Sequence, residues 1–287
     1  MFPRDGSAYR DYRAAKLDGY PTSVAELLVD IDRLQELDGD ARTRILACCE
    51  RANMAIYNCN DATVSRDSVR AFGAQFGLHR LDHHLCSNDD GVSEVTNASG
   101  GERAGYVPYS DRSLSWHTDG YYNEDACQVL AVVLHCEHDA ATGGESALLD
   151  PEIAYIKLRD ADPAFIEAFE HPECMTIPAN NTASGDIRPI SIGPVFSYDS
   201  NDGALHMRYS ARKKYIHWRD DAATTADREC LADLLDDADG PVLHYRLQPG
   251  QGLISNNVLH NRTAFTDGPA RKRLLYRARF FDHIHTS

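Results

Sequence analysis

The sequence predicts a single domain built on a jelly-roll-like β-barrel, with helices packed outside the barrel and a mostly helical N-terminal part. Two patterns predict this mainly β fold with added helices. Capped, helix-like segments fill most of residues 1–80, whereas short β-branched segments divided by Gly- and Pro-containing turns fill most of residues 106–282. The length of 287 residues suits one such domain over 1–287.

Helices are expected at three places in the N-terminal part, each after a side chain that can cap its first turn. They are VAELLVDIDRLQEL (24–37) after Thr22 or Ser23, ARTRILACCERANMAIY (41–57) after Asp40, and RDSVRAFGAQFGL (66–78) after Ser65. The polar segment that follows, 85–105, is rich in Gly, Ser and Asn and is expected to be a mobile loop.

Beyond this loop, apolar segments rich in β-branched residues predict strands, and turn residues separate them. The expected strands are QVLAVVLHCE (128–137), SALLD (146–150), VLHYRLQ (242–248), GLISNNVLH (252–260) and RLLYRARFF (273–281), and GPVFSYD and ALHMRYS are expected to pair as a hairpin around 200–203. Two helices interrupt the strands, one over 152–161 with Pro151 at its first position and one over 224–238.

The charge and cysteine patterns argue against several classes of partner. The formal net charge is -15, and such an acidic surface repels nucleic acid and anionic membranes. No run of 18 apolar residues predicts a membrane span, and the N-terminus lacks the apolar core of a signal peptide. Eight scattered cysteines without metal-ligand spacing fit reduced thiols. We therefore expect a cytoplasmic protein with no nucleic-acid or membrane partner, and the sequence leaves a homo-oligomer open.

A metal site is predicted from the segment WHTD. Residues two apart in an extended segment point to the same side, so His117 and Asp119 can reach one ion together. His260 is the best third ligand, because it ends the expected strand GLISNNVLH. Two histidines and one carboxylate can occupy one face of an octahedral metal, which suits non-heme Fe(II). His-x-Asp also occurs often by chance, so the motif alone does not establish a metal site.

An anion site is predicted from the strand RKRLLYRARF. Arg273, Arg277 and Arg279 alternate along it and share one face. Arginines that point into a barrel need an anion to pair with, and a guanidinium holds a carboxylate in bidentate geometry. The alternative is that this face meets solvent, where three arginines need no partner.

Four motifs resemble those of a known family and occur in its order along the chain. They are WHTD (116–119), TGGES (142–146), PGQG followed by NNVLHNR (256–262), and two arginines four apart (273 and 277). The chain resembles the taurine dioxygenase and clavaminate synthase-like (TauD/TfdA-type) family of Fe(II)/2-oxoglutarate-dependent oxygenases over about residues 106–282. The resemblance implies a double-stranded β-helix, which is a jelly roll, and an oxidoreductase that uses Fe(II), 2-oxoglutarate and O2.

Carried over by position, the resemblance implies roles for six residues. The metal ligands are His117, Asp119 and His260, and the residues that bind 2-oxoglutarate are Ser146, Arg273 and Arg277. Ser146 stands where the family usually has a Thr, and it keeps the hydroxyl. His260-Asn261-Arg262 resembles the His-Gly-Arg of some relatives but departs from it at Asn261, and the contacts of Arg262 are left open.

The reaction implied is hydroxylation of an unactivated C–H bond, with conversion of 2-oxoglutarate and O2 to succinate and CO2. Halogenating relatives lack the carboxylate that Asp119 supplies here, so its presence favours hydroxylation. Desaturation and oxidative cleavage stay open. Two further alternatives are a hydrolase or isomerase that uses another divalent metal, and a non-catalytic metal-binding jelly-roll protein.

The substrate is expected to be a small polar or carboxylate-bearing metabolite. Tyr121 and Tyr122 follow the metal motif and could wall a pocket, or could simply pack against the barrel. Arg208 begins a basic cluster with Arg212, Lys213 and Lys214 that could attract an anionic substrate in this acidic protein. The alternative for this cluster is a solvated surface.

Overall fold

The computed structural model describes residues 2–4, 6–61, 63–83, 87–98, 106–181, 187–200, 202–269 and 271–285. Within these ranges the chain is a mixed α/β protein with two compact units. The helical unit comprises Met1–Gly19, Trp116–Gln128 and Leu149–Val242, and the sheet unit comprises Tyr20–Ser115, Val129–Leu148 and Leu243–Ser287. None of the helices in the described ranges has the length and apolar content that a membrane crossing needs.

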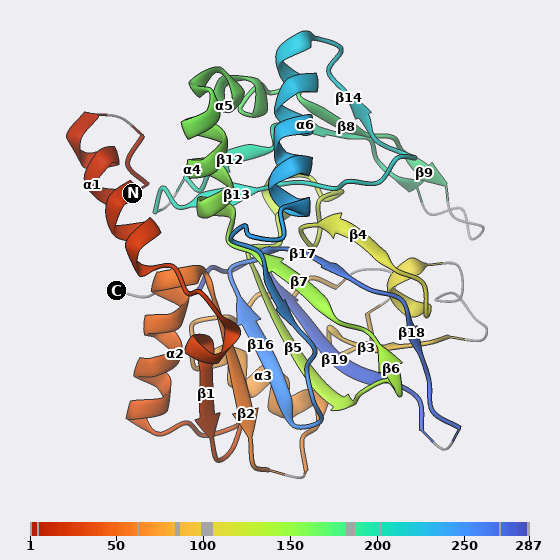
Figure 1. Cartoon of the computed structure of the whole chain (residues 1–287). Helices are drawn as coiled ribbons and strands as arrows, with labels where there is room; N and C mark the ends of the chain where they lie inside the picture. The colour runs from red at the N-terminus through yellow and green to blue at the C-terminus, as the bar shows by residue number, and fades with distance from the viewer. Residues whose placement is uncertain are drawn as a thin grey trace. The chain divides into compact units, whose positions relative to one another are not determined.

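A six-stranded sheet with the order β1-β2-β16-β5-β19-β3 forms the centre of the sheet unit. Only β1 and β2 run parallel, and the other neighbours are antiparallel. Figure 1 shows β16, a strand from late in the chain, lying between the earlier strands β2 and β5. The strands are β1 (Leu28–Ile31), β2 (Met54–Cys59), β3 (Val92–Thr96), β5 (Ala131–His138), β16 (Gln251–Ser255) and β19 (Leu274–Phe280).

Two helices pack on this sheet and enclose the main hydrophobic core. Helix α2 (Gly39–Ala52) contacts β1 and β2, and helix α3 (Arg66–Ala74) contacts β19, β5 and β3. Helix α2 begins at an Asp38 cap, whose carboxylate accepts a hydrogen bond from Ala41 N at 2.7 Å. It ends because Asn53 adopts the left-handed conformation, with φ 54°.

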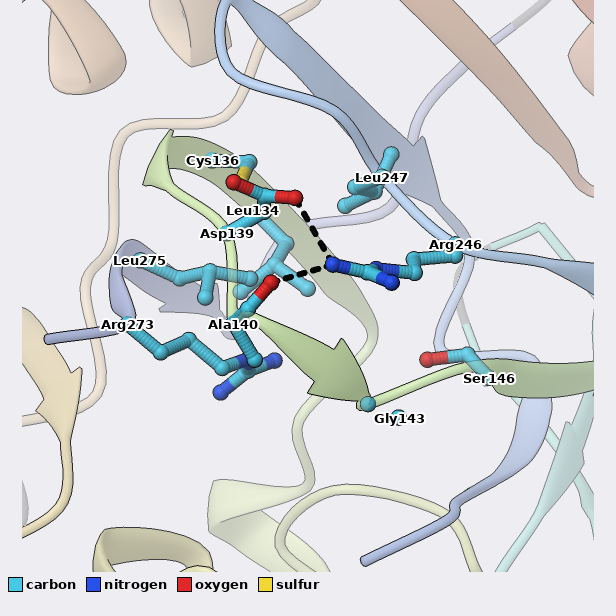
Figure 2. A pocket seen from close by; sticks show the side chains of 11 residues that line it. Leu134, Cys136, Asp139, Ala140, Gly143, Ser146, Arg246, Leu247, Arg273 and Leu275 are labelled. Atoms are coloured by element: carbon cyan, nitrogen blue, oxygen red, sulfur yellow. Dashed lines mark hydrogen bonds and ion pairs between the residues drawn. The ribbon is translucent and has the colours of Figure 1, made fainter. Parts of the chain in front are cut away.

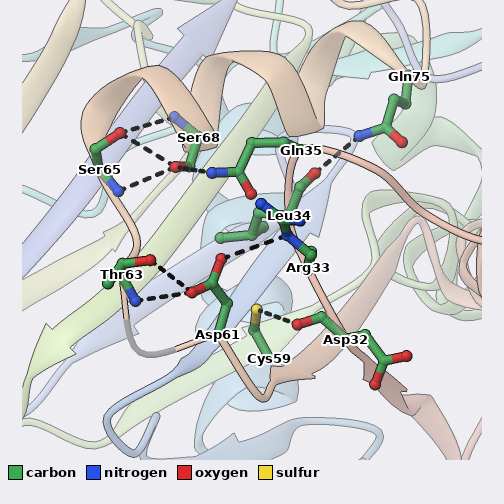
Figure 3. Close-up of polar contacts among 10 residues, drawn as sticks. All are labelled: Asp32, Arg33, Leu34, Gln35, Cys59, Asp61, Thr63, Ser65, Ser68 and Gln75. Carbon is green, nitrogen blue, oxygen red and sulfur yellow. Dashed lines mark hydrogen bonds and ion pairs between the residues drawn. The ribbon is translucent and has the colours of Figure 1, made fainter.

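The predicted start of α3 at Ser65 is confirmed. Its hydroxyl accepts a hydrogen bond from Ser68 N at 3.2 Å (Figure 3). Ser68 in turn accepts a bond from Gln35 Nε2 at 2.6 Å, and Gln75 Nε2 donates to Leu34 O at 2.8 Å. Both glutamines thus connect the segment after β1 to α3.

Three expectations for the N-terminal third are wrong in part. The expected helix over 24–37 is only a 3-10 turn (Val24–Leu27), after which β1 pairs in parallel with β2. The second helix does not continue to residue 57, because the chain after Asn53 enters β2, which is almost wholly buried. The expected loop over 85–105 contains β3, paired with β19; its residues 85–86 and 99–105 lie outside the described ranges.

A second sheet has the order β15-β7-β17-β4, and the boundary of the sheet unit runs through β4 after Ser115. The expected strand GLISNNVLH is wrong as a single strand: β16 ends at Ser255, and Asn257 turns the chain with φ 46°. Asn257 Nδ2 donates to Val129 O at 2.6 Å, which fixes the turn. The strands are β4 (Leu114–His117), β7 (Ser146–Leu149), β15 (Leu243–Tyr245) and β17 (Leu259–Arg262), with a separate pair, β6 (Thr142–Gly143) and β18 (Phe265–Thr266).

In its described residues, the helical unit has four helices and three small sheets. The two helices predicted here are confirmed as α4, capped by Asp150, and α6, capped by Asp221. The predicted hairpin is confirmed by the pairing of β12 with β13. Helix α1 was not predicted; its buried Lys16 lies 2.8 Å from Asp150 and thereby links α1 to the start of α4.

The bounds of these elements, and of the two remaining 3-10 turns, are as follows. They are α1 (Gly6–Gly19), α4 (Pro151–Ala161), α5 (Pro163–Phe169), α6 (Ala222–Asp236), the sheet β11 (Ser191–Gly193), β8 (Met175–Ile177), β14 (His217–Trp218), the pairs β12 (Phe196–Tyr198) with β13 (Leu205–Met207) and β9 (Asn180–Asn181) with β10 (Ile187–Arg188), and the 3-10 turns Val107–Tyr109 and Asp125–Cys127.

Candidate functional site

His117 and Asp119 lie close together in the helical unit. A metal-binding atom of the imidazole and one carboxylate oxygen lie within 4.8 Å of each other, and both side chains are buried. His117 forms an antiparallel bridge with Ser210, and Thr118 exchanges two hydrogen bonds with Tyr209. The Thr118 hydroxyl accepts one of them, from Tyr209 N at 3.1 Å. These bonds fix the backbone between the two candidate ligands.

Two tyrosines follow the metal motif after a turn at Gly120, which has φ 69°. The ring of Tyr121 lies edge-on to the imidazole of His117, with 6.3 Å between centroids, and edge-on to Tyr122 at 5.3 Å. Arg212 Nη1 donates to Tyr121 OH at 3.4 Å, and the Arg188 guanidinium lies 5.4 Å from the Tyr122 ring centroid. Aromatic rings and two guanidiniums therefore gather beside His117 within one unit.

Arg208 differs from the rest of its basic cluster. Arg212, Lys213 and Lys214 are exposed, whereas only 3% of Arg208 is exposed. Its guanidinium donates to main-chain carbonyls and to one hydroxyl in β8 and β11, and burial lowers its pKa to about 10. The side chain thus crosslinks strands, which is a structural use that the sequence did not predict.

His260 lies in β17 of the sheet unit, one residue after the strand begins. Its Nδ1 is 2.8 Å from Val258 O. A carbonyl oxygen can only accept, so this contact places the proton on Nδ1 and makes Nε2 the nitrogen that carries the lone pair. The neighbouring Asn261 accepts a hydrogen bond from Ala147 N at 3.2 Å, which ties β17 to β7.

Arg262 holds a loop and an aromatic ring in place. Its guanidinium donates to the carbonyls of Pro108, Ser110 and Arg112, at 2.9 Å for Ser110 O. Its Cζ also lies 4.8 Å from the centroid of the Phe265 ring. Burial, with a smaller effect from Arg273, lowers the pKa of Arg262 to about 9.

A pocket of about 310 Å³, counting its open mouth, lies within the sheet unit (Figure 2). Two glycines shape one wall. A Cβ on Gly143 would approach Ala264 O to 2.1 Å, and both Gly143 and Gly144 have positive φ. The lining residues are Leu134, Cys136, Asp139, Ala140, Gly143, Gly144, Ser146, Arg246, Leu247, Arg273 and Leu275.

Arg273 gives this pocket the character of an anion site. The residue is 8% exposed, its Nη1 is buried, and no described atom of the protein accepts a hydrogen bond from that nitrogen. Burial is the main cause that lowers its pKa to about 10. Its Cζ lies 5.0 Å from the Phe265 ring centroid, so the guanidinium is held in position while one of its nitrogens is left for a ligand.

The other two arginines of the predicted face have different surroundings. Arg279 is 2% exposed and forms a buried ion pair with Asp82. Arg277 is half-buried in β19, opposite Leu134 and Ser93, and does not line the pocket. The alternative that this face meets solvent is therefore wrong for Arg273 and Arg279.

The sequence reasoning missed Arg246 and Asp139, which also line the pocket. Neither residue belongs to a motif with recognisable spacing. The one signal in the sequence was an arginine inside VLHYRLQ, an otherwise mostly apolar segment that was expected to be a strand.

Comparisons with known proteins show the family to which the chain belongs. The family model described as "Taurine catabolism dioxygenase TauD, TfdA family" matches residues 17–279. A uridine-5'-phosphate dioxygenase from an Amycolatopsis species is 33% identical over 168 residues, which are 57% of this chain and 59% of that protein. A second protein of that name, from a Streptomyces species, is 29% identical over 205 residues, 68% of this chain and 69% of that protein.

The fold is similar to that of a solved asparagine oxygenase in complex with Fe(II), 2S,3S-3-hydroxyasparagine and succinate. The two share 17% identity and a TM-score of 0.59, covering 96% of this chain and 92% of the other. A likeness at this identity concerns the fold alone.

Proposed function

Because the chain belongs to the taurine dioxygenase (TauD, TfdA) family, we propose that it is an Fe(II)/2-oxoglutarate-dependent dioxygenase that oxidises a small molecule. Its core would be the family's double-stranded β-helix, and both compact units would form one oxygenase domain over 1–287. The similarity in fold to an oxygenase solved with Fe(II) and succinate supports this.

The proposed metal ligands are His117, Asp119 and His260. The donor chemistry fits Fe(II), because two neutral imidazoles and one carboxylate leave coordination positions open. His117 ends strand β4, and His260 lies in strand β17. The proton on His260 Nδ1 fixes that ring with Nε2 as the ligand atom.

The observation that carries the co-substrate proposal is the buried Arg273 nitrogen without a protein acceptor, in a pocket that also contains Ser146. An unpaired buried guanidinium is costly, and a carboxylate relieves the cost through charge-assisted hydrogen bonds. We therefore assign the distal carboxylate of 2-oxoglutarate to Arg273 and the Ser146 hydroxyl. Arg277 stays a proposed contact on the strength of the family motif alone.

Bound iron, with 2-oxoglutarate and O2, supplies the oxidising power, and 2-oxoglutarate is converted to succinate and CO2. The residues of the chain orient the reactants. Arg273 and Ser146 fix one end of the co-substrate, and the rigid backbone around Thr118 holds His117 and Asp119. Since Asp119 supplies the carboxylate that halogenating relatives lack, the proposed outcome is hydroxylation.

The proposed substrate is a nucleoside 5'-phosphate, because two relatives are named uridine-5'-phosphate dioxygenases. Tyr121 and Tyr122 offer aromatic faces for a base beside His117, and Arg212 offers a cation for a phosphate. Arg208, which the sequence suggested as a substrate contact, is proposed instead to hold β8 and β11 together.

Succinate release tests the function and the substrate together. The full chain, supplied with Fe(II), 2-oxoglutarate and O2, should release succinate with uridine 5'-phosphate and far less with uridine. No succinate with any nucleotide, nucleoside or small polar acid would overturn the dioxygenase assignment. Equal release with uridine would overturn the phosphate preference alone.

A matched pair of variants examines Arg212. Replacing Arg212 with Gln should raise the KM for uridine 5'-phosphate about five- to tenfold, since a charge-assisted contact is lost. The nearby Lys214→Gln removes another exposed charge, and it should leave KM within twofold. If both variants raise KM equally, Arg212 acts only through the general surface charge and does not contact the phosphate.

A further inference from the structure

Arg246 is anchored at the rim of the pocket by one side of its guanidinium. It follows β15 directly, and its Nη2 donates to Asp139 Oδ2 at 2.8 Å and to Ala140 O (Figure 2). Both acceptors lie just after β5, so two segments that are far apart in the sequence meet at this contact. The planar guanidinium is thereby fixed in orientation.

The Nε of Arg246 is buried and has no acceptor among the described protein atoms. Arg273 Nη1 is likewise buried without a described acceptor, and Arg246 and Arg273 line the same pocket. Two buried N–H donors without partners in one small pocket carry a substantial desolvation cost. One anionic group with two oxygens could satisfy both, because each carboxylate oxygen accepts more than one hydrogen bond.

The charges in the pocket match one carboxylate. The lining residues include two guanidiniums, Arg246 and Arg273, and one carboxylate, Asp139, which leaves one positive charge. Burial, and to a smaller extent the positive charge of Arg246, lowers the pKa of Arg273. An anion bound between them would relieve this repulsion.

We propose that Arg246, oriented by Asp139, is a second arginine that binds the distal carboxylate of 2-oxoglutarate, with Nε as its donor. Arg273 and Ser146 bind the same carboxylate. Three residues then donate hydrogen bonds to the distal carboxylate of the co-substrate. The pocket therefore favours a dicarboxylate over a 2-oxo acid that lacks this carboxylate. This inference rests on the proposed function.

Binding of two 2-oxo acids tests the proposal. Fe(II)-loaded full chain is titrated without O2, once with 2-oxoglutarate and once with 2-oxopentanoate, which lacks the distal carboxylate. The Arg246→Gln variant should bind 2-oxoglutarate about tenfold more weakly, which corresponds to ~1.4 kcal/mol. Its binding of 2-oxopentanoate should change less than twofold. Equal weakening for both acids, or no weakening for either, overturns the proposal.

A readout without metal separates binding from iron chemistry. Glutarate carries the distal carboxylate but no 2-oxo acid, and it should raise the melting temperature of the metal-free wild type more than that of Arg246→Gln. If both proteins respond equally to glutarate, Arg246 does not contact that carboxylate. The melting temperatures without ligand report whether the variant is folded.

Two comparison variants distinguish the possible failures. Arg271→Gln removes an arginine on the other side of Asp139, at 3.7 Å and outside the pocket lining, and it should leave both affinities within twofold. Arg273→Gln should weaken 2-oxoglutarate at least as much as Arg246→Gln. If Arg273→Gln weakens binding and Arg246→Gln does not, only this inference fails. If the wild type binds no 2-oxoglutarate at all, the proposed function fails.

Discussion

At the scale of single residues, the ring of Phe265 lies beside two guanidiniums of the sheet unit. The Cζ atoms of Arg262 and Arg273 lie 4.8 and 5.0 Å from its ring centroid. The Nε of Arg262 and the Nη1 of Arg273 are both buried without a described acceptor, but Arg262 donates to main-chain carbonyls and lies outside the pocket lining, whereas Arg273 lines the pocket. This contrast separates a structural arginine from one that is available to a ligand, and no spacing rule in the sequence distinguishes them.

Ser146 provides the sharpest residue-scale prediction. Ser146→Ala should raise the KM for 2-oxoglutarate about five- to tenfold, because loss of one hydrogen bond to a charged group costs roughly 1–1.5 kcal/mol. Ser146→Thr, which restores the family's usual residue and keeps the hydroxyl, should stay within threefold of the wild type. Steady-state succinate formation measures both. A wild-type KM in the alanine variant would remove Ser146 from the co-substrate site.

At the scale of elements, local sequence predicted helices and strands where tertiary contacts agreed with it. Helices α4 and α6 form where they were expected, and Asp150 and Asp221 cap them. The segment Leu28–Ile31 lies within the expected helix 24–37, yet it becomes β1, and its pairing with β2 buries Val29 and Ile31. Pairing with a distant strand decides the structure of this segment, and the local sequence does not contain that information. Strand β3 was not predicted for the same reason, because it forms by pairing with β19.

The end of β6 supplies an element-scale prediction. Gly143 has φ +72°, and a Cβ there would approach Ala264 O to 2.1 Å. Gly143→Ala should therefore lower the melting temperature by at least ~4 °C, from a cost of about 2 kcal/mol or more, and weaken 2-oxoglutarate binding. Gly268→Ala is the control, since its Cβ would meet nothing closer than 3.5 Å at ordinary φ. Equal melting temperatures for the two variants would contradict the proposed close approach.

Helix α6 carries a buried carboxyl that makes stability depend on pH. Asp227 is fully buried, neither carboxylate oxygen has a hydrogen-bond partner among the described atoms, and burial raises its pKa to about 8. The unfolded pKa is about 4, so between pH ~4 and ~8 the unfolded chain releases a proton that the folded protein keeps. The free energy of unfolding therefore falls as the pH rises through this window.

Replacing Asp227 with Asn removes this loss, because the amide does not ionise. The melting temperature of Asp227→Asn should exceed that of the wild type by on the order of 5 °C at pH 8, and the difference should close towards pH 4. Thermal melts at pH 4, 6 and 8 measure it. A constant or reversed difference across these pH values would show that Asp227 is ionised in the folded protein.

At the scale of the whole molecule, the proposed site draws on distant parts of the chain. His117 and Asp119 belong to the helical unit, and His260, Ser146 and Arg273 belong to the sheet unit. These five residues could be predicted because their spacing follows motifs that resemble a known family. Arg246 could not be predicted, since its place in the pocket depends on Asp139, more than 100 residues earlier in the chain. The substrate region likewise depends on contacts such as Arg212 with Tyr121.

The most direct test of the central claim is optical titration of the Fe(II)-loaded protein with 2-oxoglutarate in the absence of O2. We predict a visible metal-to-ligand charge-transfer band that saturates at one 2-oxoglutarate per iron, and that is lost in His117→Ala, Asp119→Ala and His260→Ala. The Lys214→Gln variant should keep the band. A wild type that binds iron yet shows no band at saturating 2-oxoglutarate, or ligand variants that keep it unchanged, would contradict the claim.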